Sequence, residues 1–168
     1  MWTFTGKERP PFAEVPGPGQ ESVWDYPRPP ALVDDARRVQ VRASGRVLAD
    51  SSRAVRVLET ASPPTFYLPP GDVALDRFVD APGRSFCEWK GAASYLALDQ
   101  ATQAVAWFYS DPSPRFARLR GYVAFYPSRV ECFVDDERVR AQAGEFYGGW
   151  VTDEIVGPFK GDPATGHW

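Results

Sequence analysis

Proline and glycine interrupt this sequence along its whole length. The 168 residues include 17 prolines and 14 glycines, and aromatic residues make up 14% of the chain. Proline removes a backbone donor and disfavours helix interiors, whereas aromatic residues favour strands. The combination predicts short strands joined by tight turns and argues against long helices.

The prolines and aromatic residues divide the chain into a domain with two arms. Residues 1–30 contain seven prolines, which exclude a helix or an interior strand, and also five large aromatic side chains, too many for a free tail. We expect this N-terminal arm to pack on the domain. Residues 31–145 are predicted to form one β domain, and the Gly/Pro-rich residues 146–168 a C-terminal arm with a similar role. The aromatic residues of the first arm are Trp2, Phe4, Phe12, Trp24 and Tyr26.

The composition argues against several partners and compartments. The formal net charge is -3 and the pI about 5.2, without the clustered basic residues that bind nucleic acid. No apolar run approaches the ~20 residues of a membrane span, and the opening MWTFTGKERPP lacks the apolar region of a signal peptide. We expect a cytoplasmic protein without nucleic-acid or membrane partners, with Cys87 and Cys132 as reduced thiols.

Metal and nucleophilic chemistry have few candidate residues. His167 is the one histidine, and with the two cysteines it makes three ligands, fewer than the four of most structural zinc sites. A Ser-His-Asp or Cys-His centre would have to take its base from the next-to-last residue. Neither GxGxxG nor GK[ST] appears. We therefore expect no metal and no cofactor.

Alternating residues predict strands between the arms. In RVQVRASGRVLADS, Val39 and Val41 alternate with polar residues, and Ser44-Gly45 forms a hairpin turn. RAVRVLET is predicted to be a strand because of its β-branched residues, with a helix as the alternative. PPTFYLPP, AVAWFYS and GYVAFYP are three more strands, and RVECFVDDERV is a hairpin that turns at Asp135-Asp136.

Two further segments complete the prediction. SFCEWKGAASYLAL, residues 85–98, is predicted to be one long strand with a bulge at Gly91. DPSPRFARLRG is the one predicted helix, with Ser113 as its N-cap, Pro114 at its first position and Gly121 after its end. The pattern predicts a mainly β single domain of seven or eight strands, rolled into a barrel or folded sheet.

Several motifs resemble those of a bacterial family. ADSSRAVRVLETASPPTFYLPPGDV, CEWKGAASY, AWFYSDP and GYVAFYPSRV occur in this order in the family called domain of unknown function 427, which the chain resembles from about Val39 to Val134. The flanks ESVWDYPRPP and FYGGWVTDEIVGPFKG resemble those of actinobacterial members. The resemblance implies an Mss4-like folded-sheet pseudo-barrel (a β-tent), as in methionine sulfoxide reductase B, and no established activity.

The chain departs from two patterns that would imply an activity. Nucleotidyltransferase chemistry needs a Gly-Ser turn followed by paired aspartates that alternate on a strand, whereas Asp135 and Asp136 are consecutive and lie in a predicted turn. Members of the family usually carry histidine where this chain has Tyr122. That difference argues against a mechanism that needs an imidazole at this position.

Glu59 is the most informative candidate for a functional site. On a strand it points to the same face as Val55 and Val57, so a core-facing strand buries its carboxylate as well. A buried carboxylate must be paired, hydrogen-bonded or neutral. Glu59 is therefore either a general base or ligand anchor in a pocket, or a strand-end carboxylate that accepts backbone N–H groups.

The stretch around Lys90 offers a thiol and an amine. On a single strand, Cys87 and Trp89 share one face, whereas Phe86, Glu88 and Lys90 share the other, where Glu88 and Lys90 form a solvent-facing ion pair. Cys87 is interpreted as a small buried residue, with a reactive thiol as the alternative. Lys90, next to the expected bulge, is the stronger candidate for a ligand contact. The pattern places Cys132 in the core.

Four aromatic residues either fill the core or line a pocket that stacks a flat ligand. We consider three functions. The preferred one is a module that binds an unidentified small molecule, with Glu59 and Lys90 at its polar ends. The second is a small metal-independent enzyme with Glu59 as base, a tyrosine as acid, and Lys90 or Cys87 as nucleophile. The third is an interaction domain, such as a homodimer, whose arms pack between subunits. The aromatic set is Tyr67, Tyr95, Trp107 and Tyr109.

Overall fold

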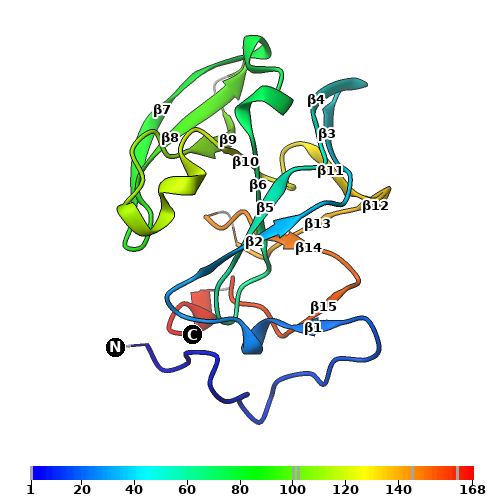
Figure 1. The fold of residues 1–168 in the computed structure, drawn as a ribbon, viewed down its shortest axis with the longest axis vertical. Helices are drawn as coiled ribbons and strands as arrows, with labels where there is room; N and C mark the ends of the chain where they lie inside the picture. Colours follow the sequence, from blue (N-terminus) through cyan, green and yellow to red (C-terminus); the bar gives the residue numbers. More distant parts are fainter. Residues whose placement is uncertain (1, 100, 102, 145, 162) are drawn as a thin grey trace.

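A seven-stranded antiparallel sheet runs through the computed structural model, which describes residues 2–99, 101, 103–144, 146–161 and 163–168 (Figure 1). The sheet is mainly built from the segments that the alternating pattern predicted. It has two edges, the first and last strands in its order. In spatial order its strands are β2 (Ala31–Asp35), β5 (Ala54–Leu58), β6 (Thr65–Leu68), β10 (Val123–Phe125), β9 (Ala104–Phe108), β8 (Gly91–Leu98) and β7 (Phe78–Cys87).

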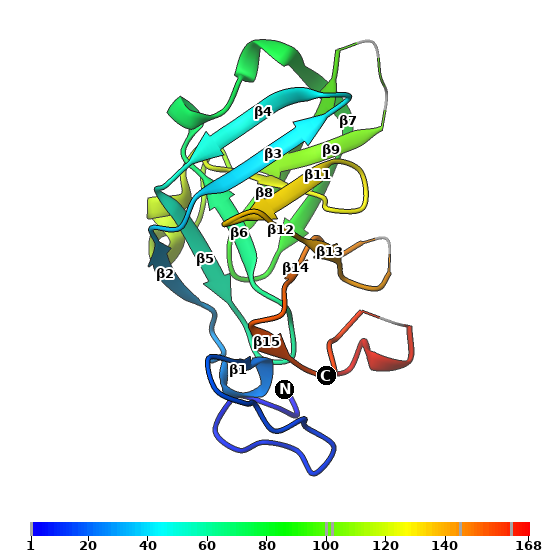
Figure 2. The same ribbon diagram turned by 90° about the vertical axis from the view of Figure 1, so that its right-hand side faces the viewer.

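A four-stranded sheet covers one side of the larger sheet (Figure 2). Its order is β12 (Glu137–Arg138), β11 (Glu131–Val134), β3 (Val39–Ala43) and β4 (Arg46–Ser51). Both predicted hairpins are confirmed here. Their turns have the positive φ angles of tight hairpin turns, 50° and 75° at Ser44 and Gly45, and 45° and 69° at Asp135 and Asp136.

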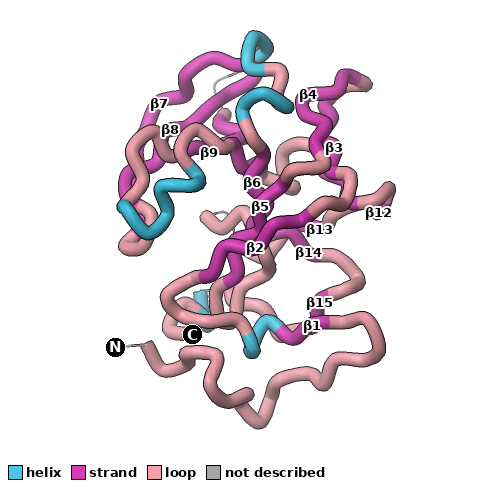
Figure 3. The backbone as a smooth tube through the Cα atoms, viewed as in Figure 1, coloured by secondary structure: helices cyan, strands magenta, loops and turns pink. Residues whose placement is uncertain are grey.

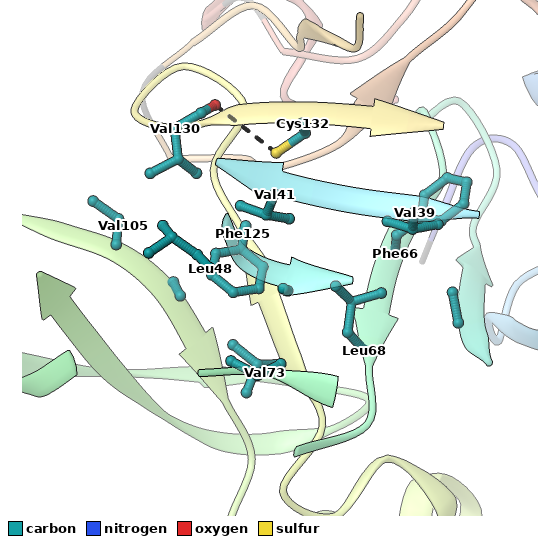
Figure 4. Packing of buried hydrophobic residues seen from close by; sticks show 14 of the residues in the cluster. Val39, Val41, Leu48, Phe66, Leu68, Val73, Val105, Phe125, Val130 and Cys132 are labelled. Atoms are coloured by element: carbon teal, nitrogen blue, oxygen red, sulfur yellow. Dashed lines mark hydrogen bonds between the residues drawn. The ribbon is translucent and has the colours of Figure 1, made fainter. Parts of the chain in front are cut away.

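The main hydrophobic core lies between these two sheets (Figure 4). Val41 and Leu48 from the smaller sheet meet Phe66 and Phe125 from the larger one, and each is at most 2% exposed. Cys132 lies in the same core, where burial raises the pKa of its thiol. The predicted core position of Cys132 is confirmed.

The remaining elements are short (Figure 3). Two-residue strands form two small sheets, so the described residues contain more strands than the seven or eight predicted. The first small sheet pairs β1 (Glu21–Ser22) with β15 (Ile155–Val156) in parallel, and the second pairs β13 (Arg140–Ala141) with β14 (Trp150–Val151). The 3-10 helices are η1 (Val23–Asp25), η2 (Pro70–Asp72), η3 (Leu75–Arg77), η4 (Pro114–Leu119) and η5 (Pro163–Thr165).

The longest helix occupies the predicted place but differs in type and capping. Helix η4 is a 3-10 helix with Pro114 at its first position. Ser113 precedes it, as predicted, but its hydroxyl does not cap the helix. Instead, Ser113 Oγ donates a hydrogen bond to the carbonyl oxygen of Trp89 at 2.6 Å. The serine therefore joins the helix to the hairpin tip beside it.

The prediction of one long strand over residues 85–98 is wrong. The chain reverses there, since Cys87 at the end of β7 pairs with Gly91 at the start of β8. Gly91 has a φ of 106°, which disfavours other residues. The first half of β7 was missed because it contains Pro82 and Gly83. Both lie where the β7–β8 register shifts, on an edge strand that tolerates the missing donor of proline.

The larger sheet is not closed into the expected barrel. Its edges, β2 and β7, do not pair with one another. The physical reason is that both faces of the sheet are apolar: in β6, Phe66 and Leu68 enter the core between the sheets, whereas Tyr67 enters a second cluster on the opposite face. A sheet buried on both faces needs a layer on each side. The mainly β fold class is confirmed.

The two arms pack against one another and against the end of β5. Trp24 is fully buried, with the rings of Phe4, Phe12 and Trp168 edge-on around it at centroid distances of 5.1–5.2 Å. Phe12 stacks on Trp168 at 5.2 Å. Figures 1 and 2 both show the two termini close together at the lower end of the molecule. Among the described residues, no helix has the length and apolar character needed to cross a bilayer.

Candidate functional site

A cavity of about 270 Å³ lies against the second face of the larger sheet. Strand alternation directs Val57, Tyr67 and Trp107 to this face. The tip of the β7–β8 hairpin forms another wall, and the C-terminal arm a third. The cavity is thus built by segments that lie far apart in the sequence.

The sheet side of the cavity is aromatic. The Nε1 of Trp107 donates a hydrogen bond of 3.2 Å to the hydroxyl of Tyr67, and the two rings meet edge-on at 6.2 Å. Tyr126 packs on Trp107 at 4.6 Å. Burial raises the pKa values of Tyr67 and Tyr109 well above the usual range and that of Tyr126 to about 12. These phenols are therefore neutral hydrogen-bonding groups at pH 7.

A backbone hydrogen bond fixes the position of Lys90 in the cavity wall. It ends the three-residue loop between β7 and β8, and its carbonyl oxygen accepts a 3.0 Å hydrogen bond from the N–H of Ser113. Its side chain lines the cavity, with Nζ 5.8 Å from the ring centroid of Tyr109, and the residue is 9% exposed. An ammonium group is thereby placed over an aromatic face.

Glu59 also lines the cavity, directly after β5. Its Oε2 lies 3.5 Å from Nε of Arg28, whose side chain is 1% exposed. The guanidinium nitrogens of Arg28 also donate hydrogen bonds of 2.8–3.0 Å to backbone oxygens of Phe4, Thr60 and Trp168. Burial lowers the pKa of Arg28, and Glu59 opposes that change. Glu59 is thus a paired carboxylate at the junction of both arms.

The C-terminal arm adds a second ammonium group, Lys160, that the sequence patterns did not single out. Lys160 is 4% exposed, and its Nζ lies 4.7 Å from the ring centroid of Trp2 and 5.6 Å from that of Tyr147. Its Nζ also lies 3.4 Å from the backbone oxygen of Trp168. Burial lowers the pKa of Lys160, and the positive charge of Arg28 adds to this effect.

The predicted ion pair between Glu88 and Lys90 is wrong. Lys90 is buried rather than solvent-facing, and the structure places no carboxylate of a described residue within ion-pairing distance of it. The reason is the hairpin, which puts both residues in a turn, where the side-by-side geometry of strand residues does not apply. Glu88 nevertheless lines the same cavity.

The hairpin also brings a thiol and a hydroxyl pair to the cavity. Cys87 is partly exposed and packs against the aromatic cluster. Tyr95 and Ser85 share a hydrogen bond of 2.6 Å between their hydroxyl oxygens. Tyr122, the residue at the histidine position of the resemblance, packs against this cluster but does not line the cavity.

The C-terminal arm approaches the sheet closely at Gly148. A Cβ atom there would lie 2.3 Å from Cη2 of Trp107, so only glycine fits without a shift of the indole. Beside it, the side-chain oxygen of Gln142 accepts a 3.0 Å hydrogen bond from the N–H of Gly149. These contacts hold the arm against the aromatic wall.

All seven candidate residues from the sequence line this one cavity: Glu59, Tyr67, Cys87, Lys90, Tyr95, Trp107 and Tyr109. Some of the residues that sequence reasoning missed come from the arms, where no alternation marks a face, and others from the domain itself. Among them are Trp2, Tyr126, Gln142, Tyr147 and Lys160. One available signal was the scarcity of lysine, since Lys7, Lys90 and Lys160 are the only three in the chain.

Comparison with known proteins gives one family. A family model described as a domain of unknown function, DUF427, matches residues 31–136, which is more than half of the chain. No curated protein matches the chain. The matched segment includes the sheet and hairpin walls of the cavity, whereas Trp2 and Lys160 lie outside it.

Proposed function

We propose that the protein, which belongs to the DUF427 family, binds a small molecule in the aromatic cavity. The proposal rests on the site alone, because a family description or a fold does not by itself assign an activity. The observation that carries this proposal is the convergence of rings and charged side chains on one hollow. Ligand sites are typically concave and mostly apolar, with a few well-placed polar groups. The cavity has this composition, with Tyr67 and Trp107 on its sheet side and Glu59 and Lys90 in its walls.

The volume restricts the ligand to a small molecule. A cavity of about 150 Å³ is large enough to hold benzene in an engineered protein. The cavity of this protein, about 270 Å³, has room for one aromatic ring together with a polar group. The proposed ligand therefore has the size of a small metabolite.

The test is a thermal-unfolding screen with a broad panel of small metabolites. We expect at least one compound to raise the melting temperature of the wild-type protein, and Lys90→Met to remove most of that shift. Lys7→Met is the matched control, because Lys7 is an exposed lysine that does not line the cavity. A panel without any stabilising compound, or equal shifts in both variants, would contradict the proposal.

One observation favours a small metal-independent enzyme as the second candidate: Cys87 lines the same cavity as Glu59 and Lys90. A catalytic thiol must react as a thiolate, faster than an ordinary cysteine. Titration of the native protein with a thiol reagent tests this, with buried Cys132 as the unreactive internal reference. Reaction of Cys87 no faster than that of a free peptide thiol would remove the redox version of this candidate.

A further inference from the structure

Lysine and arginine have different places in this molecule. Every ion pair between described residues uses an arginine, and most of these pairs lie on the surface. Lysine occurs three times in the chain. Lys7 is exposed, whereas Lys90 and Lys160 are 9% and 4% exposed and both line the cavity. The two buried lysines therefore differ from the buried arginines, Arg28 and Arg56, which both form ion pairs with carboxylates.

Neither buried ammonium is neutralised by a described carboxylate. The structure gives Lys90 and Lys160 no ion pair within the described residues, and Glu59, which lines the same cavity, is paired with Arg28. Lys160 Nζ has one oxygen contact, a hydrogen bond of 3.4 Å to the backbone oxygen of Trp168. Burial of a charge without a partner is costly. The rings of Tyr109, beside Lys90, and of Trp2, beside Lys160, compensate only in part, because a cation–π contact is weaker than an ion pair.

The charged side chains that line the cavity are not paired with one another. The lining holds two ammonium groups, Lys90 and Lys160, and two carboxylates, Glu59 and Glu88. Glu59 pairs with Arg28, which is not part of the lining, and Glu88 is exposed and forms no ion pair with a described residue. The two lysines therefore have no carboxylate partner among the described residues.

One buried hydrogen-bond donor of the cavity lining has no acceptor among the described residues. Trp89 lines the cavity, and its buried Nε1 has no acceptor among the described residues. Lysine is a donor only, with three N–H groups on each ammonium. Buried donors are normally satisfied, so a molecule that carries hydrogen-bond acceptors matches this lining.

We infer that the cavity takes an organic anion, with a flat apolar body against Trp107 and an acidic group, carboxylate or phosphate, neutralised by Lys90 and Lys160. The inference rests on the proposed binding function and specifies the chemical class of its ligand. An aromatic acid with one ring matches the volume of about 270 Å³. The two lysines without a carboxylate partner favour negative charge on the ligand, and the Trp89 N–H favours a hydrogen-bond acceptor.

Four probes with the same ring separate charge from shape: benzoate, phenyl phosphate, neutral benzamide and cationic benzylamine. Dissociation constants are measured by titration followed by protein NMR. We expect at least one of the two anions to bind ten times more tightly than benzamide or more, and benzylamine to bind most weakly. The ratio between benzoate and phenyl phosphate then distinguishes a carboxylate from a phosphate as the preferred group.

Substitutions of single lysines test which of them bind the anionic group. Lys90→Met and Lys160→Met each keep an unbranched apolar side chain of similar length, and we expect each to weaken the anion at least fivefold while benzamide binding stays unchanged. Lys7→Met is the matched control, since Lys7 is the exposed lysine. Lys90→Arg restores the charge and should recover part of the anion affinity. The melting temperature of each variant establishes that it is folded.

The outcomes separate this inference from the proposed function. Equal binding of benzoate, phenyl phosphate and benzamide would overturn the anion class and support binding itself. Anion affinity that is unchanged in both cavity variants would also overturn the inference. Failure of all four probes, together with a metabolite panel that gives no thermal shift, would overturn both.

Discussion

Two groups of buried or partly buried charges in this molecule are arranged in opposite ways. In the first, which we call the ion network, every charge has a partner of opposite sign. Arg37 donates to Asp35 at 2.6 Å and to Glu154 at 2.7 Å, and Arg56 contacts Glu21 at 3.1 Å and Asp35 at 3.3 Å. The network connects β1, β2, β5 and the turn before β15. It therefore ties both arms to the larger sheet.

In the second group, the cavity lysines, the positive charges of Lys90 and Lys160 face rings instead of carboxylates of the described residues. Buried ion pairs contribute little net stability, but removal of one partner is strongly destabilising. Charges that serve the fold are therefore expected to be paired within it. A buried charge without a partner lowers the stability of the fold, and a ligand of opposite charge can offset that loss. We propose that the two lysines are such charges and bind an anionic ligand.

The largest effect is expected from breaking the ion network. Arg56→Met leaves Asp35, whose side chain is 7% exposed, without one of its two arginines and leaves Glu21 without its arginine. We expect the free energy of unfolding to fall by about 3 kcal/mol, as for other broken buried pairs. Chemical denaturation measures this change. Arg120→Met, which removes an exposed pair with Asp111, should cost no more than about 0.5 kcal/mol. Equal losses in the two variants would contradict the contrast.

A smaller effect is expected from acid. Burial acts to raise the pKa of Asp35, but hydrogen bonds from Arg37 outweigh it and lower the pKa; for Glu21, burial is likewise outweighed by hydrogen bonds from Arg56 and Tyr26. Carboxyls with a lower pKa in the folded state bind fewer protons there than in the unfolded chain. Their contribution is therefore fully present above the unfolded pKa of about 4 and is lost as the pH falls through the folded pKa.

The measurement is the melting temperature between about pH 6 and pH 3, a window set by these unfolded-state pKa values. The wild-type protein should lose stability steadily below about pH 4. Arg37→Met should start from a lower melting temperature and show a flatter dependence, because the pKa of Asp35 then lies closer to its unfolded value. Parallel curves for the two proteins would show that the network does not set the acid sensitivity.

The smallest effect on stability is expected from the cavity lysines. Lys90→Met removes a buried charge that has no described carboxylate partner, so no group is left unpaired. We expect the free energy of unfolding to stay within about 0.5 kcal/mol of the wild-type value or to rise. The same denaturation experiment compares it directly with Arg56→Met. A loss above about 1 kcal/mol would mean that Lys90 serves the fold as Arg56 does.

Much of the sheet was predictable because strand signals are local. Val39 and Val41 alternate with polar neighbours, and the turn residues Ser44 and Gly45 mark the reversal directly. The β7–β8 hairpin was not predictable in this way. Pro82 and Gly83 are unfavourable in strands, so the local pattern does not predict the first strand. The pairing of Cys87 with Gly91 depends on this strand and is therefore not predicted either.

The candidate site likewise has one part that local sequence patterns predict and one part that they do not. Val55 and Val57 share one face of β5, and Glu59, directly after the strand, lines the cavity on the same side. The period of two holds wherever the strand lies, so the amino-acid sequence alone determined that these side chains belong together. Tertiary structure alone decided that Lys160 and Trp2 cover this face and that Arg28 pairs with Glu59. These residues come from arms without a repeating pattern, and their places follow from long-range packing of rings and charges, which no short stretch of sequence encodes.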